Sequence, residues 1–373
     1  MTALSYLDAA ELRDALPWEV AVPGLEAALT SGLDPEEDGP RLFTPIPNGE
    51  FLLMPAATAT AAGIKVLTLA PENPARGLQK VQGTYLLFDA DTSAPLAAMD
   101  GTELTAIRTP AVTMVGLRAL AAAAPEENPF PHAPRVLVIG AGVQALNHAR
   151  AAAWVWPGAT FLISGRRPER VAELVDTLRG ERITADAADG GLEEAVRGAD
   201  VIITVTTSSE PLFPGEWVAD GALVAAVGQH GLDAREVDAA LVHRADVLVE
   251  GRASALAEAG DLIPARSAEE WERIAPPNLA DGVSGRLTRR PGAPGLYCGV
   301  GMSWEDLVLA DLAARAGSGG PITGAPVTGS PAHGDARTAP DPAASGSDVP
   351  RPEAPGTDAS TPAPQTKEGR DSA

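Results

Sequence analysis

The segment Gly-Ala-Gly-Val-Gln-Ala at residues 140–145 is the clearest chemical motif of the sequence. It follows the apolar run RVLVIG (135–140), which is typical of a buried parallel strand. In the pattern of a dinucleotide site, Gly140 makes the tight turn, Gly142 lets the backbone approach a pyrophosphate, and Ala145 lets the next helix pack closely. That helix would present free N–H groups to the phosphates. The motif predicts dinucleotide binding, and a tight turn in a domain that binds nothing is the alternative.

The residues after the second apolar run, ATFLISG (159–165), indicate which dinucleotide binds. An NAD site usually carries an acidic residue there, which binds the ribose 2′-hydroxyl. Here the sequence reads Ser164-Gly165-Arg166-Arg167, with two guanidinium groups and no acid. Arginine suits a 2′-phosphate because its hydrogen bonds are bidentate and charge-assisted. We therefore expect NADP(H) in preference to NAD(H), which stays possible; two solvated arginines at a helix start are the alternative.

Two cations in the N-terminal third stand out by their positions in the sequence. Lys65 interrupts the apolar run GIKVLTL, so it either extends to solvent or points into a site. Arg108 directly precedes Thr109-Pro110, which looks like the N-cap and first residue of a helix, and it too could be a surface residue. If Lys65 is buried beside arginines, its pKa should fall, which would suit it to proton transfer.

The elements that position these residues fall into two patterns. From residue 135 onward, apolar strands alternate with helical segments, which predicts a doubly wound α/β domain with a parallel sheet. Before it, a helical stretch at 5–30 is followed by short extended runs separated by Pro, Gly and Asn, which indicate a mixed or antiparallel sheet. The extended runs lie at 51–55, 64–69 and 84–88, and the later strands at 200–206, 222–228 and 246–251.

The composition allows a large core and disfavours some partners. Hydrophobic residues make up 45% of the 373 residues, enough for roughly two domains. The net charge of −22 argues against nucleic acid and anionic membranes. No apolar run of about 18 residues and no basic leader is present, so we expect neither a transmembrane helix nor a signal peptide. Cys298 is the one cysteine, which excludes an intrachain disulfide and fits a cytoplasmic protein.

Two further expectations concern the tail and metal binding. Residues 317–373 are rich in Pro, Ala, Gly and Ser and have few large apolar side chains, so we expect a disordered tail. No cluster of His, Cys and Asp has the spacing of metal ligands, so we expect no metal site.

Several motifs together resemble the ornithine cyclodeaminase/mu-crystallin family, over roughly residues 5–316. The resemblance implies a Rossmann domain at 119–294. It also implies a second α+β domain, formed by 1–118 and 295–316, that binds substrate and forms a homodimer. The motifs are MPAATATAAGIKVLTLAPENPARGL (54–78), TELTAIRTPAV (102–112), VIGAGVQA (138–145), EPLFPGEWVADGALVAAVG (210–228) and GVGMSWEDLVLADL (299–312).

The resemblance also assigns roles to single residues. Lys65 matches the family's active-site lysine, Arg108 matches the arginine that holds the substrate carboxylate, and Arg41 looks like a second carboxylate arginine. Two arginines and a lysine suit an amino or imino acid, because they offer its carboxylate bidentate and point-charge contacts. Positions that touch the dinucleotide in the family match Val143, Gln144, Thr206 and Val227.

The sequence departs from the cyclodeaminases at two acidic positions. The catalytic aspartate that follows the Val-Gly strand end is matched here by His230, and a second acid that contacts the substrate's side-chain amine is matched by Leu52. An unpaired buried ammonium is costly, so we expect ornithine to be a poor substrate. His230 could act as an acid, could orient the substrate, or could be an ordinary loop residue.

We therefore expect an NADPH-dependent reductase that transfers a hydride to the C=N bond of an α-imino acid, of the Δ1-pyrroline-2-carboxylate or cyclic ketimine type. An ornithine cyclodeaminase or an amino-acid dehydrogenase is the alternative. A non-catalytic small-molecule binder is a lesser one.

Overall fold

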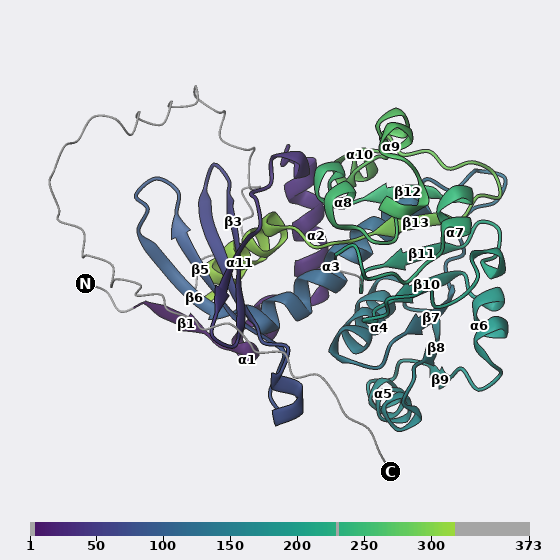
Figure 1. The fold of residues 1–373 in the computed structure, drawn as a ribbon, viewed down its shortest axis with the longest axis horizontal. Coiled ribbons are helices and arrows are strands. Elements are labelled where there is room, and N and C mark those ends of the chain that lie inside the picture. The colour runs from purple at the N-terminus through teal and green to yellow at the C-terminus, as the bar shows by residue number, and fades with distance from the viewer. Residues whose placement is uncertain (1–3, 229–230, 318–373) are drawn as a thin grey trace, which may run out of the picture. The chain divides into compact units, whose positions relative to one another are not determined.

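The computed structural model of the chain describes residues 4–228 and 231–317. Two sheets with helices packed on them make up this part (Figure 1). His230 and, from residue 318 onward, the predicted disordered tail lie outside the described residues. No described helix has both the length and the apolar character that crossing a membrane requires.

The first sheet is mixed, and its strands come from the N-terminal hundred residues. The strands are antiparallel to their neighbours except for β1, which pairs in parallel with β6. The predicted extended runs lie within β3, β4 and β5. In spatial order the strands are β1 (Ser5–Leu7), β6 (Pro95–Asp100), β5 (Val81–Asp89), β4 (Ala61–Leu69), β3 (Gly49–Ala57) and β2 (Leu42–Ile46).

One face of this sheet is covered by helices that also contact one another. Along β4, Ala61, Lys65 and Leu67 are buried and alternate with partly exposed residues, as side chains do along a strand. The helical stretch predicted at 5–30 is β1 followed by two helices, because Pro17 separates them. The covering helices are α1 (Ala9–Ala15), α3 (Gly101–Ala122) and α11 (Ser303–Gly317), and α2 (Trp18–Thr30) packs on α3 and α11.

Helix α3 begins nine residues earlier than Thr109-Pro110 suggested. Asp100 is the N-cap, and its side chain accepts hydrogen bonds from the backbone of the first turn. Pro110 lies inside the helix and cannot donate to the carbonyl of Ala106. The side-chain amide of Asn147 donates to that carbonyl instead, at 3.1 Å. Arg108 is therefore a buried residue within the helix rather than a surface residue before it.

The second sheet is fully parallel, and its inner strand β7 leads directly into the glycine motif, as predicted for a doubly wound α/β domain. Residues 295–298, which the resemblance places with the second domain, form strand β13 inside this sheet, so the parallel sheet extends past residue 294. In spatial order the strands are β12 (Asp246–Val249), β13 (Gly295–Cys298), β11 (Leu223–Ala226), β10 (Val201–Thr204), β7 (Arg135–Ile139), β8 (Thr160–Ser164) and β9 (Ala185–Ala187).

The parallel sheet is flanked by helices on both faces (Figure 1). One continuous apolar cluster joins the two sheets through α3. The helices of this part are α4 (Val143–Val155), α5 (Pro168–Gly180), α6 (Leu192–Gly198), α7 (Ala239–Arg244), α8 (Arg252–Glu258), α9 (Ala268–Ile274) and α10 (Leu279–Val283); the short 3-10 turns are η1 (Pro35–Glu37), η2 (Asn73–Arg76), η3 (Gly215–Trp217) and η4 (Ile263–Ala265).

Candidate active site

Lys65 points inward from β4 and is paired with an acid on α11. Its side chain is 1% exposed, and Nζ lies 2.6 Å from Oδ2 of the fully buried Asp306. Nζ also lies 3.5 Å from Oγ1 of Thr105 on α3. Burial lowers the pKa of Lys65 to about 8, although Asp306 opposes that shift. An amine with this pKa can exchange a proton near neutral pH.

Arg108 on α3 also contacts the acids of α11. Its Nη1 donates to Oε2 of Glu305 at 2.8 Å, and its Nε lies 3.9 Å from Oδ1 of Asp306. Nε is buried without a hydrogen-bond partner, and Nη2 donates no hydrogen bond to a described residue. Burial and the charge of Glu250 raise the pKa of Glu305 well above its usual range, despite Arg108. Arg108 therefore keeps part of its guanidinium group available for a second carboxylate.

The segment between β13 and α11 holds this charge cluster together. The backbone N–H groups of Val300 and Gly301 donate to Oε2 of Glu250, at 2.9 and 2.6 Å. Gly301 has a φ of 75°, and a Cβ atom there would lie 2.5 Å from Nη1 of Arg108. Only glycine fits this position, because the guanidinium group occupies the space of a side chain.

Two side chains of the segment after α2, Asp38 and Arg41, hold the backbone around the start of α11 in place. Asp38 accepts hydrogen bonds from the backbone N–H groups of Ser303 and Trp304 and so caps α11 from outside the helix. Burial raises the pKa of Asp38 to about 6. Arg41 donates to the carbonyls of Val300 and Gly301 and to Glu258. The structure thus gives Arg41 partners within the chain, and its contact with a substrate carboxylate stays a prediction.

The glycine motif lies in a loop that fits a dinucleotide. Gly140 has a φ of 143°, and a Cβ atom there would lie 2.7 Å from a methyl group of Val205. Gly142 is the N-cap of α4, and nothing lies within 4 Å of where its Cβ would be. The next residue, Val143, is 66% exposed, although it is apolar. An open backbone, a helix N-terminus and an uncovered apolar side chain are what a pyrophosphate and its attached groups require.

Gln144 connects this loop to the helix that carries Arg108. Its side-chain Nε2 donates to the backbone carbonyl of Thr105 at 3.4 Å, and its buried Oε1 has no partner in the described part of the chain. Thr105 is also the residue whose hydroxyl lies next to Lys65. The glycine loop and the charge cluster therefore meet at one turn of α3.

Arg166 and Arg167 are exposed just after β8, and the described residues offer them no ion pair. Arg167 occupies the N-cap position of α5. Their guanidinium groups are free to bind an external anion at the end of the second strand.

Two of the predicted cofactor positions lie at the ends of strands β10 and β11, where a buried acid organises them. Glu236 accepts hydrogen bonds from the hydroxyl of Thr204, from the N–H and hydroxyl of Thr206, and from the N–H of Gly228. Burial raises its pKa despite these bonds. The polar groups of Thr206 are thus used inside the protein, and Val227 is buried at the end of β11. Their contact with a cofactor stays a prediction.

Sequence reasoning missed the acids of the site. Glu305 and Asp306 occupy the first turn of α11, where acids usually compensate the helix dipole and face solvent. The available signal was that apolar residues follow them directly, in LVLADL (307–312). Glu236 lies six residues after His230 in the sequence, out of register with the position of the cyclodeaminase aspartate. Asp38 and Glu250 gave no signal, since their partners lie far away in the sequence.

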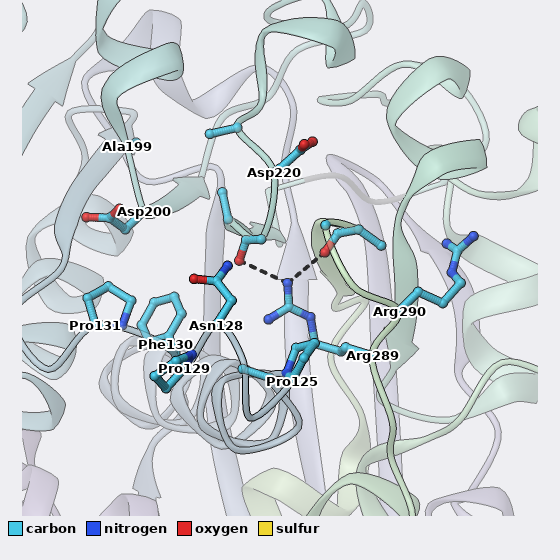
Figure 2. Close-up of a pocket in the computed structure, with 16 residues that line it drawn as sticks. Pro125, Asn128, Pro129, Phe130, Pro131, Ala199, Asp200, Asp220, Arg289 and Arg290 are labelled. Carbon is cyan, nitrogen blue, oxygen red and sulfur yellow. Dashed lines mark hydrogen bonds between the residues drawn. The ribbon is translucent and has the colours of Figure 1, made fainter.

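A cavity of about 140 Å³ lies elsewhere, at the amino ends of β10, β11 and β13 in the parallel sheet (Figure 2). The buried Arg289 there donates through Nη2 to the carbonyls of Gly221 and Ala293, both at 2.9 Å. Through Nη1 it reaches the carbonyl of Leu120 near the end of α3, at 3.4 Å. These bonds tie three segments together, which accounts for the arginine. Ligands of such sheets bind at the carboxyl ends of the strands, so we do not place the active site here.

No group of three or more His, Cys, Asp or Glu with metal-binding geometry occurs in the described ranges.

Known proteins are similar to this chain in sequence and in fold. Residues 21–315 match the ornithine cyclodeaminase/mu-crystallin family. Delta(1)-pyrroline-2-carboxylate reductase 2 of Burkholderia ambifaria is 35% identical, over 85% of this chain and 98% of its own. Delta(1)-pyrroline-2-carboxylate/Delta(1)-piperideine-2-carboxylate reductase of Azospirillum brasilense is 34% identical, with the same coverage.

A solved structure agrees with these relatives. The Delta(1)-pyrroline-2-carboxylate reductase of Thermococcus litoralis, in complex with NADH and L-proline, superposes with a TM-score of 0.72 and is 27% identical. The match covers 84% of this chain and 97% of that one. The family match and the relatives both extend across the two sheets and the charge cluster between them, and the chain belongs to the ornithine cyclodeaminase/mu-crystallin family.

Proposed function

We propose that this protein is an NADPH-dependent reductase of a cyclic α-imino acid of the Δ1-pyrroline-2-carboxylate type. One observation carries the proposal: Lys65 and Arg108 are buried on neighbouring acids of α11, and apolar side chains lie beside Lys65. Met54 lies opposite Lys65 in the register of β3 and β4, and Leu52 lies opposite Leu67 two residues further on. The three apolar residues form one cluster. Such an apolar surface suits an aliphatic ring, and the two cations suit the carboxylate and the nitrogen of a cyclic imino acid.

The residues divide the reaction between binding and proton transfer. The free Nη2 group of Arg108 binds the substrate carboxylate, because guanidinium groups bind carboxylates with charge-assisted hydrogen bonds. The Lys65 ammonium donates a proton to the imine nitrogen. A bound reduced nicotinamide supplies the hydride that the C=N carbon accepts. The C=N bond becomes an amine, and Lys65 then regains its proton from solvent.

The glycine loop and the arginines after β8 would hold the cofactor. Gly140 shapes the turn, Gly142 leaves room for the pyrophosphate, and Val143 and Gln144 border it. Arg166 and Arg167 bind the 2′-phosphate, which favours NADP(H) over NAD(H).

Ornithine cyclisation is the less suitable reaction for this site. Leu52 is buried against Leu67, so the strand that would supply an acid to the side-chain amine supplies a methyl surface instead. Asp233 is exposed and does not replace that acid within the described residues. His230, the position that matches the cyclodeaminase aspartate, stays a candidate acid. A protein that only binds a ligand would not need the buried ion pair of Lys65.

We also infer a homodimer formed through the open face of the first sheet. Ile64, Leu86, Ala98 and Tyr6 lie in one row across four strands, on the face opposite Lys65. Tyr6 is 54% exposed, which is unusual for a large side chain on a sheet. A second copy of the chain would cover this row. Light scattering should give twice the monomer mass, and Leu86→Glu should give the monomer mass.

A substrate panel tests the proposed reaction. The purified protein is mixed with NADPH or NADH and with Δ1-pyrroline-2-carboxylate or Δ1-piperideine-2-carboxylate, and loss of the reduced-nicotinamide absorbance is followed. L-ornithine with NAD is assayed in parallel for ammonia and proline. We expect cofactor oxidation with at least one cyclic imine. Ammonia release from ornithine without imine reduction would overturn the proposal.

A further inference from the structure

The cation buried on β4 is a lysine in a protein whose basic residues are mostly arginines. Three of the 28 lysine and arginine residues are lysines, at positions 65, 80 and 367. Lys80 is exposed, whereas Lys65 is almost completely buried. Arginine stays charged under all ordinary conditions, but lysine can lose its proton when it is buried. The one buried lysine of the described residues therefore suggests a group that must release a proton.

Asp306 is held so that it can serve this lysine. Its carboxylate is fully buried, and Oδ2 contacts Nζ of Lys65 at 2.6 Å. Oδ1 has no hydrogen-bond donor among the described residues. Asp38 fixes the start of α11 three residues before, and Glu305 fixes it again through Arg108. Asp306 thus reaches Lys65 from a helix start that other residues hold in place.

We propose that Asp306 is the positioning residue of the reduction: it holds the Lys65 ammonium in one place and keeps it protonated until the imine nitrogen accepts the proton. This inference rests on the proposed function. Asp306 stays a carboxylate throughout the step, and Lys65 becomes a neutral amine and is reprotonated by solvent. The role is indirect, because Asp306 acts through Lys65 rather than on the substrate.

The charges around Lys65 predict in which direction its pKa changes when Asp306 loses its charge. Burial and the charge of Arg108 lower the pKa of Lys65, whereas Asp306 and Glu305 raise it, with a balance at about 8. Tyr85 lies opposite Lys65 on β5, and burial raises its pKa well above the usual value, so it stays neutral. Removing the charge of Asp306 leaves the lowering influences in place. The pKa of Lys65 then falls below about 8, and the protonated form is lost at a lower pH.

Asp306→Asn is compared with two variants that remove a charge from the same helix. Glu305→Gln takes the carboxylate from Arg108 rather than from Lys65. Asp311→Asn removes a carboxylate that pairs with Arg315 at 2.8 Å, and it serves as the matched control. For each protein, kcat and kcat/KM for the cyclic imine are measured across the pH range. Protein labelled with ¹³C at the lysine Cε is titrated by NMR without cofactor, which follows Lys65 itself; Lys65→Met identifies its signal.

We expect Asp306→Asn to move the alkaline limb of kcat/KM and the Lys65 midpoint downward by about one pH unit or more, and to lower kcat by roughly tenfold near neutral pH. Glu305→Gln should chiefly raise KM, and Asp311→Asn should change neither quantity. Asp306→Glu keeps a carboxylate, so its Lys65 midpoint should lie close to that of the unmodified protein. If the asparagine variant is unstable, this variant shows whether the lost charge or the lost fold causes the shift.

Two results decide against the inference. A Lys65 midpoint that is the same in Asp306→Asn and in the unmodified protein would overturn it. So would a uniform loss of kcat at every pH with an unmoved alkaline limb, which indicates a structural role alone. Failure of the proposed function looks different: the unmodified protein then reduces no cyclic imine, while the NMR midpoint still shows whether Asp306 keeps Lys65 protonated.

Discussion

The substrate side and the cofactor side of the site are built in opposite ways. On the substrate side, Lys65 and Arg108 are buried and each is already paired with an acid of α11. On the cofactor side, the backbone at Gly142 is open, and Arg166 and Arg167 are exposed without an ion pair in the described ranges. In the proposed function, charges are thus preorganised where a proton would move, and left free where a phosphate would bind.

The difference predicts how each side responds to substitution. Breaking a buried ion pair leaves an uncompensated charge, so changes on the substrate side should affect stability together with activity. Changes to exposed arginines cost little stability, since solvent already surrounds them. Cofactor choice can therefore be altered without loss of the fold, whereas the proton-transfer site cannot be altered so freely.

The strongest test of the substrate side is Lys65→Met. We expect kcat for imine reduction to fall by roughly a thousandfold, because the proton donor is lost. The free energy of unfolding should also fall by about 3 kcal/mol, because Asp306 is left buried without a cation. Chemical denaturation measures the second effect. The double variant Lys65→Met/Asp306→Asn should regain much of this stability but no activity. Full activity in Lys65→Met would remove the lysine from the mechanism.

Arg108→Lys should raise the KM for the imino acid by roughly a hundredfold, with little change in the KM for NADPH. A lysine can pair with Glu305 or with the substrate carboxylate, but it lacks the planar fork that serves both. Steady-state kinetics with each substrate varied in turn measure the two constants. Arg118→Lys, on the exposed side of the same helix and paired with Glu26, is the control and should change neither. Equal loss of affinity for both substrates would mean that Arg108 only supports the fold.

The two glycines of the dinucleotide motif should respond differently to alanine. Gly142→Ala meets no described atom, so the fold should keep its stability while the KM for NADPH rises by roughly thirtyfold. Gly140→Ala collides with Val205 at a positive φ, so it should lose about 1–3 kcal/mol of unfolding free energy. Thermal melting and cofactor titration distinguish the two. Unchanged cofactor affinity in a stable Gly142→Ala protein would argue against a pyrophosphate at this loop.

The smallest expected effect concerns Arg166 and Arg167. The double alanine variant should lower kcat/KM with NADPH by roughly tenfold and leave the value with NADH nearly unchanged, because only NADPH carries the 2′-phosphate. Its melting temperature should match that of the unmodified protein. A parallel loss with both cofactors would contradict the assignment of these arginines to the 2′-phosphate.

The range of contacts explains which parts of the site the sequence could predict. The glycine motif acts within six residues and directly after a strand, so its spacing was sufficient to place it. The acids were missed because Glu305 lies 197 residues from Arg108 and Asp306 lies 241 residues from Lys65. Acids in the first turn of a helix are ordinary, and only the tertiary fold turns these two inward.

A long-range contact also explains why the sequence predicts the wrong start for α3. Thr109-Pro110 resembles a helix start, and proline inside a helix usually costs about 3 kcal/mol. Its cost is reduced here by Asn147, which supplies the hydrogen bond that Pro110 cannot make to Ala106. No local pattern shows that bond, since it joins α3 to the helix that follows the glycine motif. Strand β13 is a similar case, because its place between β11 and β12 depends on pairing across the whole sheet.

Transfer of a labelled hydride tests the central claim most directly. The protein is incubated with Δ1-pyrroline-2-carboxylate and NADPH that carries deuterium at the transferable position of the nicotinamide, and the product is analysed by mass spectrometry and NMR. The account predicts proline with one deuterium at Cα, formed faster with NADPH than with NADH. Absence of deuterated proline, together with ammonia released from ornithine in the presence of NAD, would contradict it.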